Sequence, residues 1–181
     1  MPDEWPLVSS QQLLALRVFR LRRDRSRSPR TGCEHDFYVL EGNDWCNVIP
    51  LTEDGEVVMI RQFRHGTRAL TLEIPGGIVD PSDGSPEAAA RRELREETGY
   101  EADRIEPLGV IRPNPAIQSN ACFSFVARGA RPAGASAPDA AEDIEVVRVP
   151  LSELPARIAR GEIAHALVVV AFTFLFGLRT P

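Results

Sequence analysis

The sequence predicts an α/β fold: a mixed β-sheet with helices on both sides in an α/β/α sandwich, plus a small N-terminal antiparallel β extension. Two observations predict this class. Short β-forming segments recur between residues 33 and 149. They are interrupted by one strongly helical segment, residues 85–99, and are followed by two more helical segments. We expect the β extension to cover residues 1–45 and the main domain to cover residues 46–181.

The N-terminal extension is predicted to contain two strands. The segment Leu13–Asp24 is strand-like around Val18 and Phe19, and Cys33–Glu41 alternates well enough for a second strand. Met1–Ser10 is expected to be loosely held. The most basic part of the chain lies here, with Arg17, Arg20, Arg22, Arg23, Arg25, Arg27 and Arg30. These arginines fit either the solvated edge of a strand or an edge that contacts anions.

The main domain begins with a predicted hairpin, Asn47–Leu51 and Val57–Phe63, joined by the turn Thr52–Gly55. A loop at Gly129–Ala141 is rich in Ala, Pro and Gly and is expected to be mobile. Further strands are expected at Leu70–Ile74, Ile105–Ile111, Ala121–Ala127 and Glu145–Val149, and helices at Leu151–Arg160 and Glu162–Leu178.

Composition limits the function classes. The 181 residues suffice for one domain with a real core, and a formal charge of -5 argues against a general nucleic-acid binder. All 21 basic residues are arginine, which suggests a compositional bias. The three cysteines, Cys33, Cys46 and Cys122, are widely spaced and form no metal pair, so a reducing, cytoplasmic compartment is the simplest inference.

No targeting or membrane segment is expected. Met1–Pro6 is acidic and contains proline, which is unlike a signal peptide. The apolar run Ala166–Leu178 is too short to span a bilayer and predicts a buried helix. We therefore expect no membrane partner.

The helix at residues 85–99 is predicted from its own ends. Ser85 suits the N-cap, Pro86 suits the first helical position, and Gly99 supplies the stop. Most of the residues between them are strong helix formers. Before it, Glu73–Gly77 resembles a strand that ends in a turn and brings bare backbone close to another group.

Three carboxylates share one face of this helix. Glu93, Glu96 and Glu97 fall at positions i, i+3 and i+4, close to the helix end where the dipole disfavours negative charge. A divalent cation would compensate them, and an oxygen-only ligand set suits Mg²⁺ or Mn²⁺. The alternative is an ordinary solvated surface helix with an Arg92–Glu96 ion pair.

The strand, the glycine pair, the acidic loop and this helix together resemble the box of the Nudix hydrolase family. The run Arg92–Gly99 matches the second half of that box without error. The first half departs from it, because the loop is one residue longer and Asp83 stands where a glutamate is usual. Tyr100 replaces the final aliphatic residue. The resemblance implies the Nudix α/β/α sandwich and makes residues 46–181 a Nudix hydrolase domain.

Three features resemble the ADP-ribose and nucleoside-diphosphate-sugar pyrophosphatases within that family. They are the strands before the domain, the segment Arg61–Arg64 before the box, and Pro115, fifteen residues after Tyr100. The resemblance implies Mg²⁺-dependent cleavage of the pyrophosphate bond of a nucleotide sugar into a nucleoside monophosphate and a sugar phosphate. It also implies a homodimer in which residues 1–45 contribute to the interface.

The resemblance assigns roles residue by residue. It implies metal ligands at Gly76, Glu93, Glu96 and Glu97, and substrate contacts at Arg61, Arg64, Asn114 and Pro115. Arg92 would pair with a box carboxylate and fix its rotamer. Glu142 is the first choice for the general base, with Asp139, Asp143, Glu145 and the box residue Glu96 as alternatives. The three histidines, His35, His65 and His165, are expected to be structural or to face solvent.

Two other functions stay open. One is a non-catalytic Nudix module that senses a sugar nucleotide, and the other is an enzyme for a different nucleotide class such as dinucleoside polyphosphates. The intact set Glu93, Glu96 and Glu97 favours catalysis over sensing, because a sensor has no need to retain it.

Overall fold

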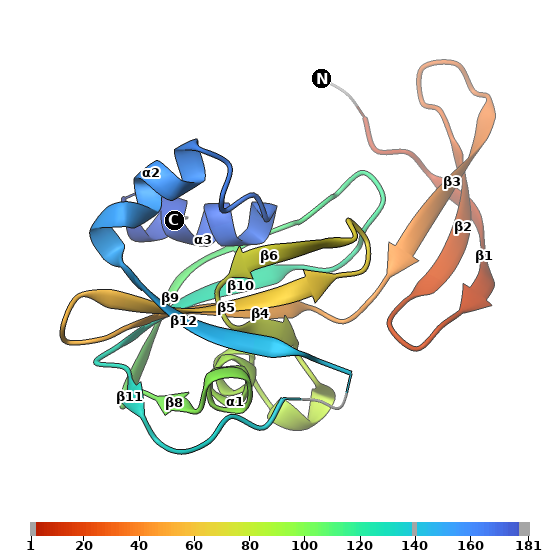
Figure 1. The fold of residues 1–181 in the computed structure, drawn as a ribbon. Coiled ribbons are helices and arrows are strands. Elements are labelled where there is room, and N and C mark those ends of the chain that lie inside the picture. Colours follow the sequence, from red (N-terminus) through yellow and green to blue (C-terminus); the bar gives the residue numbers. More distant parts are fainter. Residues whose placement is uncertain (1–2, 139–140, 178–181) are drawn as a thin grey trace. The chain divides into compact units, whose positions relative to one another are not determined.

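The structure is a computed structural model that describes residues 3–138 and 141–177 (Figure 1). The chain divides into two compact units, one within Met1–Asn43 and Arg112–Ala121, the other within Asp44–Ile111 and Cys122–Pro181. Residues 112–121, which the sequence placed in the main domain, group with the N-terminal unit. Leu40 accounts for this, because its N–H donates to Ile117 O (2.7 Å) and its O accepts from Ser119 N–H (3.2 Å).

The N-terminal unit contains a three-stranded antiparallel sheet in the order β1-β2-β3. Its strands are β1 (Leu7–Ala15), β2 (Arg20–Arg27) and β3 (Glu34–Glu41). The predicted strand centred on Val18 and Phe19 is wrong, since these residues lie in the turn between β1 and β2. The expectation that the chain is loosely held up to Ser10 is also wrong, because Leu7–Ser10 pair with β2.

The arginines of β2 pair with acids on β3. Arg25 Nε donates to Asp36 Oδ1 at 2.8 Å, Arg27 Nη2 donates to Glu34 Oε1 at 2.9 Å, and Arg22 pairs with Glu41. Arg25 and Asp36 stand opposite each other in the strand register, as do Arg27 and Glu34. These arginines therefore form cross-strand ion pairs on a solvated sheet.

The main unit is built on a seven-stranded mixed sheet, in which the order β12-β5-β4-β10-β9 is joined by β6 on β5 and β7 on β4. Only the β4–β10 pair is parallel among its described pairings. The strands are β4 (Trp45–Leu51), β5 (Glu56–Arg64), β6 (Ala69–Glu73), β7 (Gly76–Ile78), β9 (Arg104–Ile111), β10 (Cys122–Arg128) and β12 (Ile144–Pro150). The predicted hairpin is confirmed as β4 and β5.

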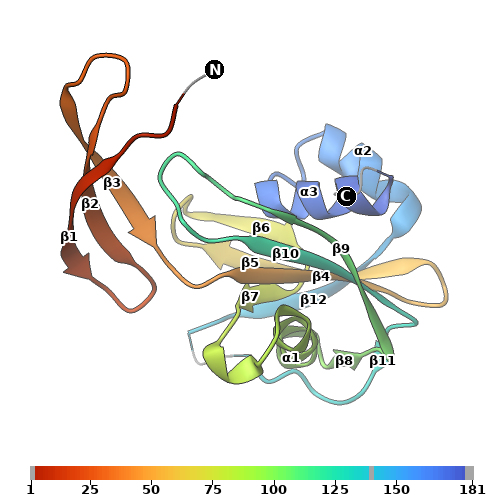
Figure 2. The same cartoon turned by 180° about the vertical axis from the view of Figure 1, so that it is seen from behind.

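Helices cover both faces of this sheet (Figures 1 and 2). On one face lies α1 (Pro86–Thr98), and on the other lie α2 (Leu154–Ala159) and α3 (Ala166–Leu175). Neighbouring residues of β4 show the two layers: Val48 packs in the core beneath α1, while Ile49 packs in the core that includes α3. This alternation confirms the predicted α/β/α sandwich.

The C-terminal helices are shorter than predicted. The first begins as a 3₁₀ turn, Leu151–Glu153, before α2. The second begins at Ala166 and not at Glu162, because Gly161 adopts a left-handed conformation (φ 76°) and a loop follows it. Leu178, the predicted end, lies outside the described residues. No helix in the described ranges has the length and apolar character that crossing a membrane requires.

Part of the segment predicted as a mobile loop, Gly129–Ala141, is attached to α1, and residues 139 and 140 lie outside the described residues. Arg131–Pro132 (β11) pairs with Tyr100–Glu101 (β8). Two backbone N–H groups then donate to the C-terminal end of α1: Ala133 to Gly99 O and Ala137 to Glu96 O, both at 2.8 Å. Residues 131–137 therefore have backbone partners at the helix end, where the last carbonyls lack donors within the helix. The mobility of the segment stays a prediction.

Candidate active site

The ends of α1 fix where its carboxylates lie. Ser85 Oγ accepts a hydrogen bond from Ala88 N–H at 3.1 Å, and Pro86 occupies the first turn. Gly99 closes the helix in a left-handed conformation (φ 71°), with its N–H donating to Arg95 O at 2.9 Å. The predicted helix and both of its caps are confirmed.

Two glycines allow the strand before α1 to pass close to its neighbours. A Cβ at Gly76 would lie 2.4 Å from Cys46 O, and a Cβ at Gly77 would lie 2.5 Å from Glu93 Oε1. The strand β6 ends at Glu73 as predicted, but the chain bends at Pro75 and both glycines belong to the next strand, β7. The predicted close backbone approach is present. Glycine at position 77 leaves room for the Glu93 carboxylate.

Arg92 gathers three carboxylates. Its Nε and Nη2 donate to Asp83 at 2.8 and 3.1 Å, while Nη1 donates to Glu93 Oε1 at 2.8 Å and to Glu96 Oε2 at 2.9 Å. The hydrogen bonds from Arg92 hold the pKa of Asp83 below its usual value. The structure thus places Arg92 where it fixes the rotamers of Glu93 and Glu96.

Glu97 is the most buried acid of the helix. The residue is 2% exposed, and its Oε2 accepts a hydrogen bond from Gly76 N–H at 2.9 Å. Burial raises the pKa of Glu97 to about 8; the Gly76 bond opposes the shift, and the charges of Glu93 and Glu142 add to it. In the absence of a cation, the ionised form of this carboxylate is poorly compensated.

Glu93 shows the same imbalance. Burial raises its pKa, Arg92 opposes the shift, and Glu96 and Glu142 add to it. Glu142 therefore lies within electrostatic range of both Glu93 and Glu97, although it belongs to the segment before β12. The structure brings this predicted base towards the box carboxylates.

The other candidate bases are placed differently. Asp139 lies outside the described residues, and Asp143 is exposed just before β12. Glu145 accepts a hydrogen bond from Arg61 Nη1 at 2.5 Å. That ion pair occupies both Glu145 and the predicted substrate residue Arg61, which stand opposite each other on β12 and β5.

Arg64, predicted to bind phosphate, is half-buried and makes a two-pronged ion pair with the buried acid Glu73. Its Nε and Nη2 donate to Glu73 at 2.8 and 2.7 Å. Sequence reasoning gave Glu73 no role. An acid between Leu72 and Ile74, both of which are buried, was a usable signal, because a buried carboxylate needs a partner.

Asn114 and Pro115, also predicted to contact substrate, belong to the N-terminal unit. Asn114 O accepts hydrogen bonds from Ile117 N–H at 3.1 Å and Gln118 N–H at 2.8 Å, which forms a tight turn. The main unit alone therefore gathers the metal, base and arginine candidates.

The donor set of α1 fits a hard divalent cation. Carboxylate oxygens are the ligands that Mg²⁺ and Mn²⁺ prefer, and the raised pKa values of Glu93 and Glu97 show that added positive charge would be favourable there. Within the described ranges, no three acid, His or Cys side chains are gathered closely enough to hold an ion. Arg92 donates hydrogen bonds to both Glu93 and Glu96, so binding of a cation by these carboxylates would require the side chains to rearrange.

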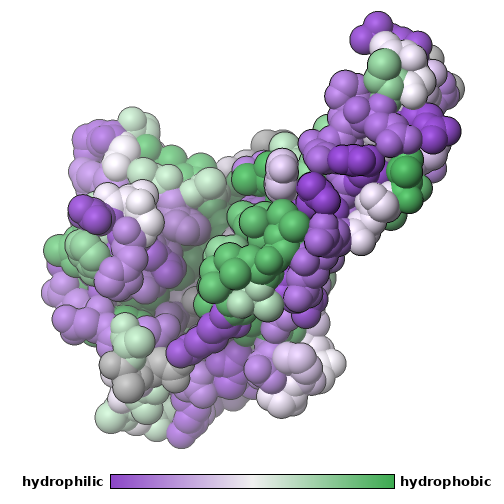
Figure 3. Space-filling model, turned by 90° about the vertical axis from the view of Figure 1, so that its right-hand side faces the viewer, coloured by the Kyte–Doolittle hydropathy of each residue, from purple (hydrophilic) through white to green (hydrophobic). Residues whose placement is uncertain are grey.

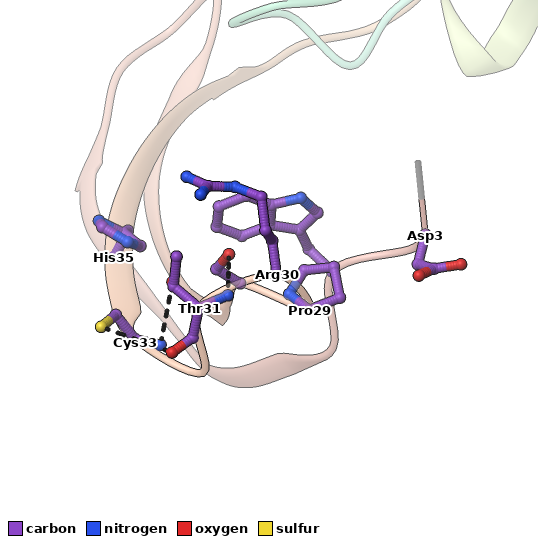
Figure 4. Close-up of a pocket in the computed structure, with 8 residues that line it drawn as sticks. Asp3, Pro29, Arg30, Thr31, Cys33 and His35 are labelled. Atoms are coloured by element: carbon purple, nitrogen blue, oxygen red, sulfur yellow. Dashed lines mark hydrogen bonds between the residues drawn. The ribbon is translucent and has the colours of Figure 1, made fainter. Parts of the chain in front are cut away.

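A separate pocket of about 760 Å³ lies in the N-terminal unit (Figure 4). Trp5 contributes to it, with its ring edge-on to Phe37 at a centroid distance of 5.4 Å. Its lining residues are Asp3, Trp5, Ser28, Pro29, Arg30, Thr31, Cys33 and His35. This set offers one acid and one permanent cation and contains none of the predicted site residues.

This chain is similar in sequence or in fold to three known proteins. The chain is 27% identical to the ADP-ribose pyrophosphatase of Mycobacterium tuberculosis over 98% of this chain and 86% of that protein. It is 33% identical to the GDP-mannose pyrophosphatase of Citrobacter koseri over 68% of each. A crystal structure of an ADP compounds hydrolase shares the fold with a TM-score of 0.86 at 21% identity, covering 97% of this chain and 94% of that one.

The family model for the NUDIX domain matches residues 46–169. This range contains β7, α1 and the carboxylates Glu93, Glu96 and Glu97. The chain belongs to the NUDIX family.

Proposed function

We propose that the protein hydrolyses the pyrophosphate bond of ADP-ribose or a related nucleoside diphosphate sugar in a Mg²⁺-dependent reaction. The products are a nucleoside monophosphate and a sugar phosphate. The observation that carries the proposal is the acidic face of α1, where Glu97 is buried against Gly76 N–H next to Glu93. The names of the similar pyrophosphatases support this substrate class.

Mg²⁺, or Mn²⁺ in its place, would be held by Glu93, Glu96 and Glu97 together with the carbonyl of Gly76. When bound, it supplies charge neutralisation for the pyrophosphate and lowers the pKa of water. Arg92 would keep its bond to Asp83 and guide the carboxylates of Glu93 and Glu96.

Residues of the chain itself carry out proton transfer and substrate binding. Glu142 takes a proton from the attacking water, since it lies in range of the α1 carboxylates and precedes β12. Arg61 and Arg64 bind phosphate oxygens, for which their planar guanidinium groups are suited. Asn114 and Pro115 are proposed as further substrate contacts.

A panel of substrates tests this proposal. Purified protein is incubated with ADP-ribose, GDP-mannose, UDP-glucose, ADP-glucose and diadenosine polyphosphates in MgCl₂, and products are separated by chromatography. We expect cleavage of at least one sugar nucleotide to a nucleoside monophosphate and a sugar phosphate, and none with EDTA. Preference for dinucleoside polyphosphates would support the second nucleotide class, and saturable binding without turnover would support a sensor.

We also propose that the protein is a homodimer to which the N-terminal unit contributes. Large apolar side chains of this unit reach the surface, more than a small sheet can bury: Leu7, Val8, Leu13, Leu14, Leu16, Val18, Phe37 and Tyr38. Figure 3 shows hydrophobic residues on the protein surface between hydrophilic ones. Light scattering at micromolar concentration is expected to give the mass of two chains, and a monomer would contradict the proposal.

A further inference from the structure

A second buried acid lies outside the acidic face of α1. Glu73, the last residue of β6, is 2% exposed. Its oxygens accept hydrogen bonds from Arg64 Nε at 2.8 Å, from Arg64 Nη2 at 2.7 Å and from Thr71 Oγ1 at 2.6 Å. His165 Nε2 lies 4.0 Å away. The carboxylate is thus fully engaged, with one guanidinium as its main partner.

The strand register shows how far Arg64 reaches to make this contact. On the β5–β6 pair, Arg64 stands opposite Ala69, whereas Glu73 stands opposite Ile60. The Arg64 side chain therefore runs back along the strands to reach the carboxylate. Two parallel hydrogen bonds fix both the direction and the plane of a guanidinium.

The held guanidinium lies within electrostatic range of Glu97 on α1. Hydrogen bonding to Glu73 raises the pKa of Arg64 most; burial opposes the shift, and the charges of Glu97 and Glu142 add to it. A guanidinium has more N–H donors than the two that Glu73 uses. Arg64 therefore binds a buried carboxylate, lies within electrostatic range of Glu97 and Glu142, and has N–H donors that Glu73 does not use.

We propose that Glu73 is a positioning residue, which holds the Arg64 guanidinium in the orientation that binds a phosphate of the substrate next to the α1 carboxylates. This inference rests on the proposed function. Because a long arginine side chain otherwise samples many rotamers, fixing it before the substrate arrives lowers the entropic cost of binding and of the transition state. Glu73 acts through Arg64 and does not touch the substrate.

The first variant is Glu73→Gln. Glutamine keeps the size of the side chain but replaces one acceptor oxygen with an NH₂ group, so the two-pronged contact is lost. We expect kcat/KM for the best substrate of the panel to fall about 10- to 100-fold, which is the scale of loss when a binding group is misplaced by about 1 Å. A variant with more than half of the wild-type kcat/KM would overturn the inference.

A double-mutant cycle separates positioning from general structural damage. If Glu73 acts only through Arg64, Glu73→Gln costs no further activity in an Arg64→Ala background, within about twofold. The same change is expected to raise the melting temperature of that background, because Arg64→Ala leaves a buried carboxylate unpaired. Relative to Arg64→Ala, the double variant would then have an unchanged kcat/KM and a higher melting temperature. A further loss of kcat/KM in the double variant would overturn the inference.

Arg64→Lys provides a route that leaves Glu73 paired. Lysine keeps the positive charge but cannot form the two-pronged contact, so we expect a loss of kcat/KM similar to that of Glu73→Gln. Full activity of Arg64→Lys would contradict the inference that the fixed orientation of the Arg64 guanidinium is needed for phosphate binding. The matched control is Glu56→Gln, which removes a partly exposed ion pair with Arg148 (3.2 Å) at the other end of β5 and is expected to leave kcat/KM unchanged.

The two possible failures are distinguishable. A wild-type protein that cleaves no nucleotide in the panel overturns the proposed function and this inference with it. An active wild-type protein with an additive cycle overturns only the role of Glu73. Binding of the α,β-methylene analogue of ADP-ribose, measured by calorimetry with MgCl₂, gives a readout without turnover; we expect its affinity to fall about tenfold in Glu73→Gln, or 1.4 kcal/mol.

Discussion

Glu73 and Glu97 are equally shielded from solvent, at 2% exposure each, yet their pKa values are shifted in opposite directions. Burial alone would raise the pKa of Glu73, but hydrogen bonds from Arg64 and Thr71 outweigh it and hold the pKa below its usual value. Glu97 has one backbone N–H as partner and carboxylates nearby, and burial raises its pKa to about 8. Because both carboxylates are equally shielded from solvent, their hydrogen-bond partners and neighbouring charges determine the direction of the pKa shift.

The difference indicates what each region is for. At the end of β6 the charge is already balanced within the protein, so that region holds a side chain in place. On α1 the negative charge exceeds the positive charge that Arg92 supplies, so this region is suited to a cation from outside. Strongly perturbed acids in such a setting are typical of functional sites.

The largest expected effect is on turnover. Glu97→Gln replaces a carboxylate with a neutral amide, which is a poor ligand for a hard cation. We expect kcat to fall about 1,000-fold or more, since metal catalysis is worth several kcal/mol. Steady-state kinetics in MgCl₂ measures this, and circular dichroism checks that the fold is intact. A folded variant with more than about a tenth of wild-type activity would contradict the assignment, because metal catalysis supplies more than that factor.

A smaller effect is expected at the proposed base. Glu142→Gln should lower kcat about 100-fold with little change in KM, as for a group that acts mainly in the transition state. Comparison with Asp143→Asn and Glu145→Gln gives the control. If one of these variants loses activity and Glu142→Gln does not, the general base is the residue substituted in that variant. If all three variants keep full activity, the general base is assigned to Glu96.

Sequence signals predicted the parts of the site that are local. Ser85, Pro86 and Gly99 define α1, and the spacing of Glu93 and Glu97 puts them on one face whatever the rest of the fold does. The hairpin turn at Thr52–Gly55 is another local feature, and it too was predicted. In each case the structure follows from residues within a few positions of one another.

Long-range partners were not predictable in the same way. The hydrogen bonds of Ala133 and Ala137 to the end of α1 form only because the chain passes back along that helix. Composition does not show this path, so the segment rich in Ala, Pro and Gly was expected to be mobile. The ion pair between Arg64 and Glu73 was missed as well, because it joins residues nine positions apart on two strands. Val18 and Phe19 have strand-forming side chains, but pairing with β1 needs a turn at that place.

The contrast between the two acids also predicts a pH dependence. Without a divalent cation, Glu97 keeps a proton in the folded state between its unfolded pKa of about 4.3 and its folded pKa of about 8. Stability is therefore lost as pH rises through this window. Glu97→Gln lacks this loss, which over about three pH units amounts to about 4 kcal/mol. Its melting temperature relative to wild type should therefore rise from pH 5 to pH 9, by about 8–16 °C. Calorimetry in EDTA measures the difference, and a constant difference would contradict the raised pKa.

Stabilisation by Mg²⁺ tests the central claim most directly. The melting temperature is measured at pH 7.5 with EDTA and with increasing MgCl₂ for wild type, Glu97→Gln and Glu73→Gln. A cation that binds only the folded state stabilises it by about 2.7 kcal/mol at a hundred times its Kd. We predict a saturable rise for wild type and Glu73→Gln and none for Glu97→Gln. An equal rise in Glu97→Gln, or loss of the rise in Glu73→Gln alone, would contradict the placement of the cation on α1.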